Sequence, residues 1–456
     1  MLLDDATDPL RIPRAPEAVW VERLLWAFML SFAFDYRASV DRQAGGGTGL
    51  DQLLFLGTCV LATLGILYFG WRHLLVRPGV WMITLWGGVL AFMAGGALLQ
   101  GVDPTRSIRT GLPFGLCLAG MINAHIAACA GLRPSRIVAP VFAAAVINIF
   151  WRILHGFLFK EISLETVRVE VLSPSTNWMA AWIGCALLLR SRFHWTLVLG
   201  SAALLTGILI TVTRALIFPV MASAVATSFC FALGCHWKIF RWSELPKRLL
   251  PVGAVAGLAV AGLVIAAAVW PALIERWGER LFHHAGDRNL ATDVSWLTRR
   301  AEAEDIVRIL GEEPNRYVHG MGVGASYTWN MAYIPELQLV YPKNADLGSD
   351  VWFAGHSTWT YALFAGGVIG LLGHLALFSN TAIQSLRSAK SNAALPGPDI
   401  WLAFLPFVAT LCFLSESATS NPFYERLAGM TFGIMAGLPQ AFHIRVSFLA
   451  RTDPHR

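Results

Sequence analysis

The stretch "QLLFLGTCVLATLGILYFGW", residues 52–71, runs for twenty residues without one charged side chain. An α-helix rises about 1.5 Å per residue, so this run can cross the hydrocarbon core of a bilayer, which is about 30 Å thick. Similar runs recur along the chain of 456 residues, of which 55% are hydrophobic and 14% are charged. Ordinary soluble domains carry about 25% charged residues. The sequence therefore predicts an integral membrane protein and excludes a soluble enzyme.

Twelve apolar segments are predicted to cross the membrane, which gives an all-α fold of about 12 transmembrane helices. Glu22 and Arg23 interrupt the first segment, and the sixth segment is short. The approximate limits of the segments are 20–36, 52–71, 79–101, 110–131, 137–158, 177–190, 196–213, 215–236, 250–272, 357–379, 400–418 and 424–443.

One long polar segment interrupts this pattern and divides the chain into three parts. Residues 1–272 hold the first nine predicted helices, and residues 357–456 hold the last three with a C-terminal tail. Between them, residues 273–356 form a loop with 8 Lys and Arg against 12 Asp and Glu, a net charge of −4. Long loops in compact proteins are usually functional or separately folded. We therefore expect this loop to be functional or to fold separately.

The distribution of Lys and Arg predicts the orientation of the protein in the membrane, because short loops on the cytoplasmic side are enriched in these residues. One alternating set of segment ends is rich in them: Arg11, Arg14, Arg72, Arg77, Arg133, Arg136, Arg190, Arg192, Lys238, Arg241, Lys247, Arg248, Arg387, Lys390, Arg445, Arg451 and Arg456. Both termini are therefore expected in the cytoplasm, with the long loop on the outer face. The net charge of +6 follows from this bias and does not indicate nucleic-acid binding.

Arg214 is the one permanently charged residue between Trp195 and Trp237, a stretch long enough for two helices joined at its outer end. An arginine so poorly shielded from lipid usually has a partner or faces a cavity. The alternative is an interfacial arginine whose side chain snorkels to the membrane surface. We favour a functional role, because snorkelling Arg and Lys belong mostly on the inner face.

A helix is predicted over residues 296–310, ended by Gly311. Its apolar stripe consists of Trp296, Ala303, Val307 and Leu310. Apolar residues at this spacing indicate an amphipathic helix lying on the outer face of the membrane. Arg299 and Arg300 flank the stripe and would be held close to the membrane surface. An ordinary solvated charge pair is the alternative for these two arginines.

Two features after this helix are candidate site elements. Gly322 and Gly324, in "HGMGVGAS" (319–326), indicate that the backbone approaches a neighbouring group closely. His356 ends the loop at the point where the next apolar segment begins. Histidine is the side chain that exchanges a proton near neutral pH. The alternative for His356 is an interfacial histidine without a catalytic role.

Neither a disulfide framework nor a metal site is expected. All seven cysteines lie in or at the edge of apolar segments, where they act as small packing residues. His283, His284 and Asp287 lie close together, but no third histidine follows nearby to complete a zinc site.

Together these features resemble the O-antigen ligase and polymerase superfamily of bacterial envelope glycosyltransferases. "ITVTRALIF" (210–218) resembles its Thr/Ser-Arg-Gly/Ala motif, and "TRRAEAEDIVRILGEEP" (298–314) resembles its Arg-led helix that ends in Pro. "HGMGVGAS" resembles its Pro-x-x-Gly-x-Gly loop. "GHSTWTYALFAGGVIGLLG" (355–373) resembles its His-Asn-x-x-Leu signature and the glycines that follow, although Ser357 stands where Asn is usual. The likeness covers residues 195–380, and the earlier segments match by hydropathy alone.

This resemblance implies a GT-C-like membrane enzyme of the bacterial inner membrane with a periplasmic active site. Its donor would be a glycan on undecaprenyl diphosphate, and its acceptor a sugar hydroxyl on a lipid-linked glycan or on lipid A core. Arg214 and Arg300, or the adjacent Arg299, would bind the diphosphate, because guanidinium groups match phosphate geometry. His356 would be the general base. Transfer would invert the anomeric centre and would need neither metal nor cofactor.

Polymerase and ligase differ in the acceptor alone, and we slightly favour a polymerase because His-Ser departs from the commoner pattern. A lipid-linked glycan flippase or another multi-span transporter is the alternative from a different class. A transporter would be expected to show internal repeats and several polar residues in mid-membrane. The sequence shows Asn123, His125 and Arg152 there, and no clear repeat.

Overall fold

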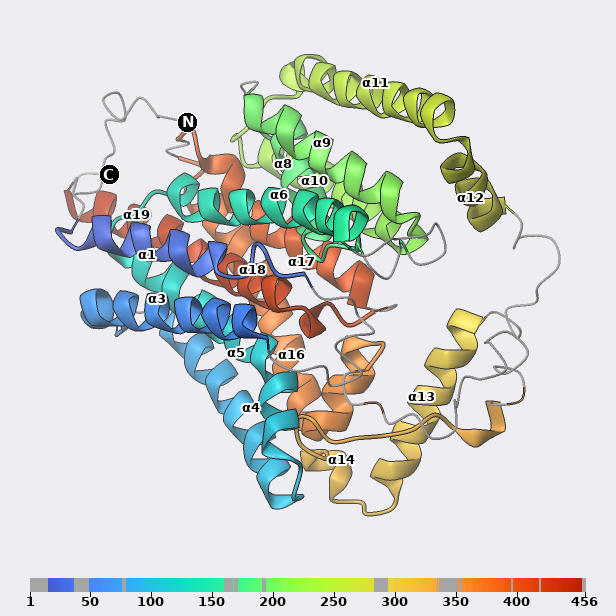
Figure 1. The fold of residues 1–456 in the computed structure, drawn as a ribbon. Coiled ribbons are helices and arrows are strands. Elements are labelled where there is room, and N and C mark those ends of the chain that lie inside the picture. The colour runs from blue at the N-terminus through green and yellow to red at the C-terminus, as the bar shows by residue number, and fades with distance from the viewer. Residues whose placement is uncertain are drawn as a thin grey trace.

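The computed structural model describes residues 15–36, 49–75, 79–159, 167, 171–190, 194–282, 294–333, 335, 352, 355–394, 397–417 and 420–452. These parts of the chain form an all-α bundle (Figure 1). The only β-type pairing among them is an isolated antiparallel bridge between Tyr327 and Trp352.

The elements follow the apolar segments closely. Asp103 caps α5 by accepting from the backbone N–H groups of Thr105 and Arg106, and Ser357 caps α16 by accepting from that of Trp359. The helices are α1 (Ala18–Leu30), α3 (Leu50–Leu74), α4 (Val80–Leu99), α5 (Pro104–Cys129), α6 (Pro134–Phe159), α8 (Ser175–Leu188), α9 (Trp195–Thr211), η1 (Arg214–Leu216), α10 (Ile217–His236), η2 (Trp242–Glu244), α11 (Leu245–Val269), α12 (Pro271–Phe282), α13 (Val294–Gly311), α14 (Arg316–His319), η4 (Met331–Tyr333), α16 (Thr358–Ser391), η5 (Ile400–Ala403), α17 (Leu405–Ser417), η6 (Pro422–Tyr424), α18 (Arg426–Gly437) and α19 (Pro439–Thr452).

Seven helices in the described ranges are long and apolar enough to cross a membrane, which confirms the membrane class. They are α3, α4, α5, α6, the combined η1–α10, the combined η2–α11, and α16. Each of the other predicted segments also contains a helix, but α1, α8, α9, α17 and α18 each have 17 residues or fewer. A count of twelve full spans is therefore not shown.

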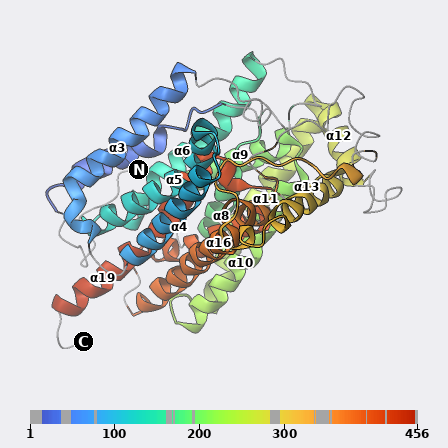
Figure 2. The same ribbon diagram turned by 90° about the horizontal axis from the view of Figure 1, so that it is seen from below.

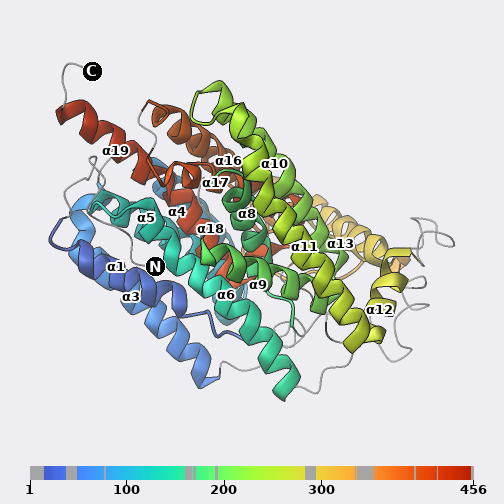
Figure 3. The same cartoon turned by 90° about the horizontal axis from the view of Figure 1, so that it is seen from above.

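The bundle has two distinct ends. Helices α12 and α13 lie at one end and α19 lies at the other, in all three views (Figures 1, 2 and 3). His356 directly precedes α16 at the end that carries α13, which we name the α13 end. A small cavity of about 40 Å³ lined by His125, Gln384, Gln440 and His443 lies toward the opposite end of α16.

Helix α11 packs differently from the other long helices. Arg248, in its first turns, donates to the carbonyl oxygens of Leu188 (3.2 Å) and Leu189 (2.9 Å). Beyond its last turn, Trp277 of α12 donates to the carbonyl oxygen of Leu209 at 2.9 Å. Between these two attachments no side chain of α11 is buried by protein. Figure 3 shows α11 running along the flank of the bundle.

The glycine-rich segment "HGMGVGAS" (319–326) fills the space between α4, α5 and α16. Helix α16 is kinked at Gly367, where φ is 59° and ψ is −154°. The carbonyl oxygens of Phe364 and Ala365 accept there from the N–H groups of Met321 (2.7 Å) and Gly322 (3.0 Å). The close approach predicted for these glycines is therefore to helix backbone.

Helix α13 forms where it was expected, but the face that it buries against the rest of the protein is not the predicted apolar stripe, of which only Leu310 is buried. Trp296 and Val307 are each 50% exposed. The buried apolar side chains are Leu297, Ala301, Ile306 and Leu310, and the carboxylates of Glu302 and Asp305 are buried on the same helix. A search for apolar periodicity misses this face because two of its buried residues are acidic.

The close packing at Gly322 leads to a prediction about stability. Gly322 has φ of +86°, and a Cβ atom there would lie 2.2 Å from the Ala97 Cα atom of α4. Gly322→Ala should lower the free energy of unfolding by at least about 1–3 kcal/mol, because both the backbone and the contact are strained. Thermal unfolding of the purified protein in detergent measures this loss.

Gly88→Ala is the matched control, because a Cβ atom at this position in α4 meets nothing within 4 Å. Alanine at a helical glycine is expected to be neutral or to stabilise by about 0.5–1 kcal/mol. Equal unfolding temperatures for the two variants would contradict the packing role of Gly322.

Candidate active site

His356 lies at the α13 end with its ring at the boundary between protein and surroundings. Ser357, the N-cap of α16, fixes the backbone directly after it. The His356 side chain is 35% exposed, so the ring is reachable while most of its surface is in contact with protein.

Glu302 of α13 binds His356 at both the ring and the backbone. Its Oε2 atom lies 2.5 Å from the ring Nδ1 atom, and its Oε1 atom accepts from the His356 backbone N–H at 2.9 Å. The Glu302 side chain is only 2% exposed. A carboxylate can only accept hydrogen bonds, so Nδ1 carries the proton and the Nε2 atom of the neutral ring keeps its lone pair.

The Tyr327 hydroxyl is a second hydrogen-bond partner of Glu302. Burial, followed by the charge of Glu302 and a hydrogen bond to it, raises the pKa of Tyr327 well above its usual value, so the phenol stays protonated. The Tyr327 hydroxyl also accepts from the backbone N–H of Gly355 at 2.9 Å. Glu302 therefore holds the His356 ring directly, and through Tyr327 it also restrains the backbone at Gly355.

Two tryptophans pack beside the His356 ring. Trp329 and Trp352 stack with ring centroids 5.1 Å apart and planes 9° apart. The Trp352 centroid lies 5.3 Å from that of His356. Trp352 is fixed by its backbone bridge to Tyr327, with N···O distances of 2.8 and 2.9 Å. The Glu302 carboxylate at Nδ1 and the neighbouring indole rings therefore both restrict the rotation of the His356 ring.

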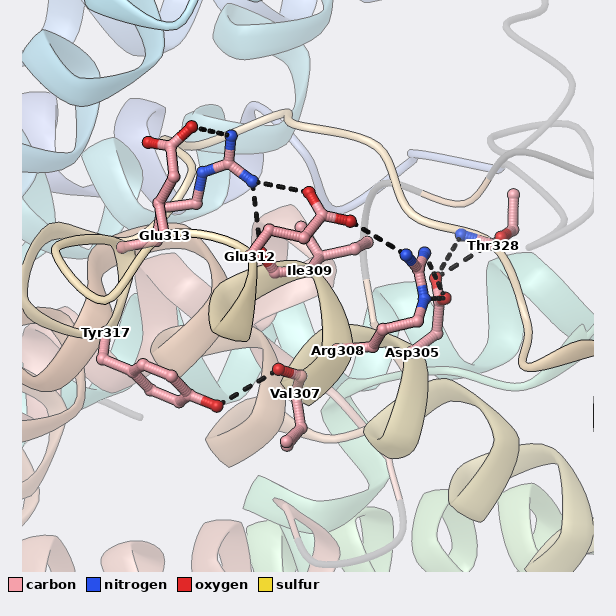
Figure 4. Close-up of polar contacts among 9 residues, drawn as sticks. Asp305, Val307, Arg308, Ile309, Glu312, Glu313, Tyr317 and Thr328 are labelled. Atoms are coloured by element: carbon pink, nitrogen blue, oxygen red, sulfur yellow. Dashed lines mark hydrogen bonds and ion pairs between the residues drawn. The ribbon is translucent and has the colours of Figure 1, made fainter.

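The second half of α13 is tied to α14 and to residue 328 by ionic contacts (Figure 4). Buried Asp305 accepts from the backbone N–H of Thr328 at 3.0 Å and pairs with Arg308 at 2.8 Å. Arg308 also contacts Glu312, which in turn pairs with Arg316 of α14 at 2.8 Å. This network fixes α13 one turn beyond Glu302.

Arg214 lies in η1, at the end of α9 nearest the α13 end, and its side chain is exposed. Within the described ranges of the chain it forms no hydrogen bond or ion pair. Val212, two residues earlier, has φ of +47° and ψ of 42°, a strained conformation for a β-branched residue. Backbone strain of this kind costs about 1–3 kcal/mol and is concentrated at functional sites.

Helix α17 connects the Arg214 and His356 regions. Cys412 donates to the carbonyl oxygen of Pro219, near the start of α10, at 3.3 Å. One turn further along α17, the Ser417 carbonyl oxygen accepts from the Ser357 hydroxyl at 3.3 Å. The arginine and the histidine are thus brought to the same end of the bundle by elements far apart in sequence.

The two adjacent arginines of α13 differ in their surroundings. Arg300 is 54% exposed, pairs with Glu304 at 2.9 Å and lies over the Tyr333 ring. Arg299 is half-buried and precedes Glu302 by three residues, so the two share one face of the helix. Arg300 lies two residues before Glu302 and is directed to a different face. The helix geometry therefore associates Arg299, rather than Arg300, with the His356 side.

Other predicted site residues are placed as follows. Gly322 and Gly324 are buried against Ala97 and Ser107, so they act as packing residues. Arg152 is buried and pairs with Glu425 of the α17–α18 connection at 3.2 Å. Among the described residues, no group of three or more His, Cys, Asp and Glu side chains could hold a metal ion. The sequence cluster of residues 283–287 lies outside the described ranges.

Glu302 is the site residue that sequence reasoning missed. Glu302 is one of three acidic residues within positions 302–305, so its charge alone does not distinguish it. The available signal was its spacing of three residues from Arg299, on a helix that precedes the histidine in the same loop.

No protein-family model matches the chain, and no curated protein matches it.

The Asp305 contact yields a prediction about the loop that supports Glu302. Asp305→Ala should leave the half-buried Thr328 N–H without its charged acceptor, at a cost of about 1–3 kcal/mol. Hydrogen exchange at the amides of residues 326–330 should accelerate correspondingly. Glu313→Ala is the control, because that side chain is 62% exposed and pairs with Arg316 alone. Unchanged protection in Asp305→Ala would contradict the anchoring role.

Proposed function

We propose that the protein is an inverting membrane glycosyltransferase that moves a glycan from undecaprenyl diphosphate to an acceptor sugar hydroxyl. The observation that carries the proposal is the His356–Glu302 pair, which leaves ring Nε2 available as a proton acceptor. The end of the bundle that carries this pair also carries the guanidinium of Arg214, which pairs with none of the described residues. A base and a phosphate-binding cation are the two groups that this reaction requires.

The arginines have the role of binding the donor diphosphate. Arg214 is exposed and has no competing carboxylate among the described residues, so its guanidinium can bind phosphate oxygens in a bidentate manner. Arg299 is the better second candidate, because it shares a face of α13 with Glu302, whereas Arg300 is directed to a different face. Positive charge fixed at the leaving group stabilises the charge that develops there during transfer.

The transfer step is a single displacement. The acceptor hydroxyl oxygen forms a bond to the anomeric carbon, while the bond from that carbon to the phosphate oxygen breaks. The diphosphate leaves with the electron pair, and the hydroxyl proton moves to Nε2 of His356. A positioned general base typically contributes about 10²–10⁴-fold to the rate. These steps are the same for a polymerase and for a ligase, and we keep polymerase as the slightly favoured assignment.

The direction of the bundle is part of the proposal. The described basic residues Arg133, Arg190, Lys238, Arg248 and Arg387 lie in or beside helix ends opposite the α13 end. The preference of Lys and Arg for the cytoplasmic side would then place the α13 end in the periplasm of the bacterial inner membrane. A lipid-linked donor in the outer leaflet would present its diphosphate at this level.

Replacement of His356 tests the base. His356→Ala and His356→Gln should both reduce turnover by about 10²–10⁴-fold, because neither side chain takes up the proton in the transition state. Donor binding should remain, since the arginines are unchanged. The assay is transfer by purified protein in nanodiscs with lipid-linked donor and acceptor, together with a separate donor-binding measurement.

His236→Ala is the control, because this exposed histidine ends α10 at the opposite end of the bundle. His374 is less suitable, because it is buried against Trp86, Phe114 and Phe423, where alanine would leave a cavity. Near-normal turnover by His356→Ala would overturn the assignment of the base.

Replacement of the arginines tests donor binding. Arg214→Ala and Arg299→Ala should each weaken donor binding by at least about tenfold, since a charge-assisted hydrogen bond contributes about 1.5–3 kcal/mol. Arg214→Lys should restore binding only in part, because an ammonium group lacks the planar fork. Arg300→Ala is the matched neighbour and should bind donor nearly normally. The opposite result for Arg299 and Arg300 would show that our choice between them is wrong.

A further inference from the structure

We infer that Glu302 is the positioning residue of the site: its carboxylate fixes the tautomer of His356 and stabilises the imidazolium that forms when Nε2 accepts a proton. This inference rests on the proposed function for its catalytic meaning. Its structural content, a single ring tautomer imposed by a buried carboxylate, can be measured without any substrate.

The geometry around Glu302 is specific to one arrangement of the ring. The carboxylate receives the Nδ1–H of His356 at 2.5 Å, the backbone N–H of the same residue at 2.9 Å, and the hydroxyl of Tyr327. A ring flip would place a carbon atom against Oε2 and forfeit the shortest of these contacts. The backbone contact prevents the histidine from moving away as a unit, so ring and main chain are held together.

Burial gives this contact its strength. With the Glu302 side chain 2% exposed, water competes little for the carboxylate, and its interaction with a charged ring is screened far less than at the surface. When Nε2 takes up a proton during transfer, the positive charge is shared by the ring and faces this fixed carboxylate through Nδ1. The stabilisation is therefore larger in the transition state than in the resting enzyme, which is the condition for an effect on turnover.

The elements around the pair make the arrangement rigid. Glu302 lies on α13, which Asp305 ties to Thr328, and His356 precedes the capped start of α16. Tyr327 connects the two sides, because it bonds Glu302 and accepts from Gly355. No contact in this set involves the exposed Arg300–Glu304 pair, which occupies another face of α13.

The test compares Glu302→Gln with Glu302→Asp, using Glu312→Gln as the control. Glutamine is nearly isosteric but neutral, and its amide can also donate to Nδ1, so both ring tautomers should become populated. Aspartate keeps the charge but withdraws the oxygens by one methylene. Glu312→Gln makes the same change of charge directly after the same helix at an exposed position, where the carboxylate contacts Arg308 and Arg316.

The first measurement is the ¹⁵N spectrum of histidine-labelled protein in nanodiscs, with His356→Gln used to assign the His356 signals among the twelve histidines. The native protein should show a protonated Nδ1 and an unprotonated Nε2, and Glu302→Gln should show a mixture. The Glu312→Gln spectrum should match the native one. An unchanged His356 signal in Glu302→Gln would overturn the positioning role.

The second measurement is transfer. Glu302→Gln should reduce kcat by at least about tenfold, as expected when a carboxylate that orients a catalytic histidine is neutralised. KM for the donor should change less than about threefold, because Glu302 does not contact it. Glu302→Asp should give a kcat between those of the native and Gln proteins. If Glu302→Gln does not fold, a native ¹⁵N spectrum and native kcat in Glu302→Asp would overturn the inference.

The two measurements separate this inference from the proposed function. An altered tautomer in Glu302→Gln together with normal transfer by His356→Ala would support the Glu302–His356 pair and reject the glycosyltransferase base. Loss of transfer in His356→Ala with an unaltered tautomer and normal kcat in Glu302→Gln would do the reverse.

Discussion

A bilayer offers no hydrogen-bonding partner to a backbone group, so any break in a helix must be repaired by the protein itself. Helix α16 breaks at Gly367, and the carbonyl oxygens of Phe364 and Ala365 accept from the N–H groups of Met321 and Gly322. This repair fixes the glycine-rich segment against the bundle. The chain that follows it then carries Tyr327 to Glu302 and to the residues just before α16. The position of the site thus depends on a packing contact made by Met321 and Gly322, about 35 residues before His356 in sequence.

Burial of acidic side chains on α13 is the second constraint. An isolated buried carboxylate is costly, so each must be supplied with donors. Glu302 receives those of His356 and Tyr327, and Asp305 receives those of Thr328 and Arg308. Helix α13 is therefore held against the bundle by directional contacts in addition to apolar ones, which gives its arginines a definite rotation about the helix axis.

Much of the fold could be predicted because long apolar runs are a strong local signal. The helices coincide with the predicted segments, and His356 stands at the start of α16 as expected. The number of spans could not be obtained, because α1, α8, α9, α17 and α18 are apolar but short. Ser357 departs from the expected Asn, yet it caps α16, and Ser and Asn are both favoured N-cap residues.

The candidate site was less predictable than the fold, for a physical reason. Arg214 stood out because it is the one permanent charge in a long apolar stretch. Glu302 did not stand out, because it is one of three acidic residues within positions 302–305 and its partner lies 54 residues further along the chain. The choice between Arg299 and Arg300 depends on which face of α13 meets the bundle, and that face differs from the expected apolar stripe. Contacts across a loop of this length are set by tertiary structure and leave no periodic pattern.

Helix α11 is hydrogen-bonded to the bundle near its two ends, and none of its side chains between these attachments is buried, so its middle part needs another packing partner. Its Leu258, Val260, Val264 and Ile265 side chains are about half exposed or more, although they are fully apolar. In a membrane these surfaces are covered by acyl chains, so the lipids next to α11 serve as its packing partners where other helices use protein. Lipid chains attract such a helix about as well as neighbouring helices do, and the hydrogen bonds of Arg248 and Trp277 then decide where it stands. Annular lipid is in this sense a component of the fold, and the surroundings of α9, whose end leads into Arg214, change with the composition of the bilayer.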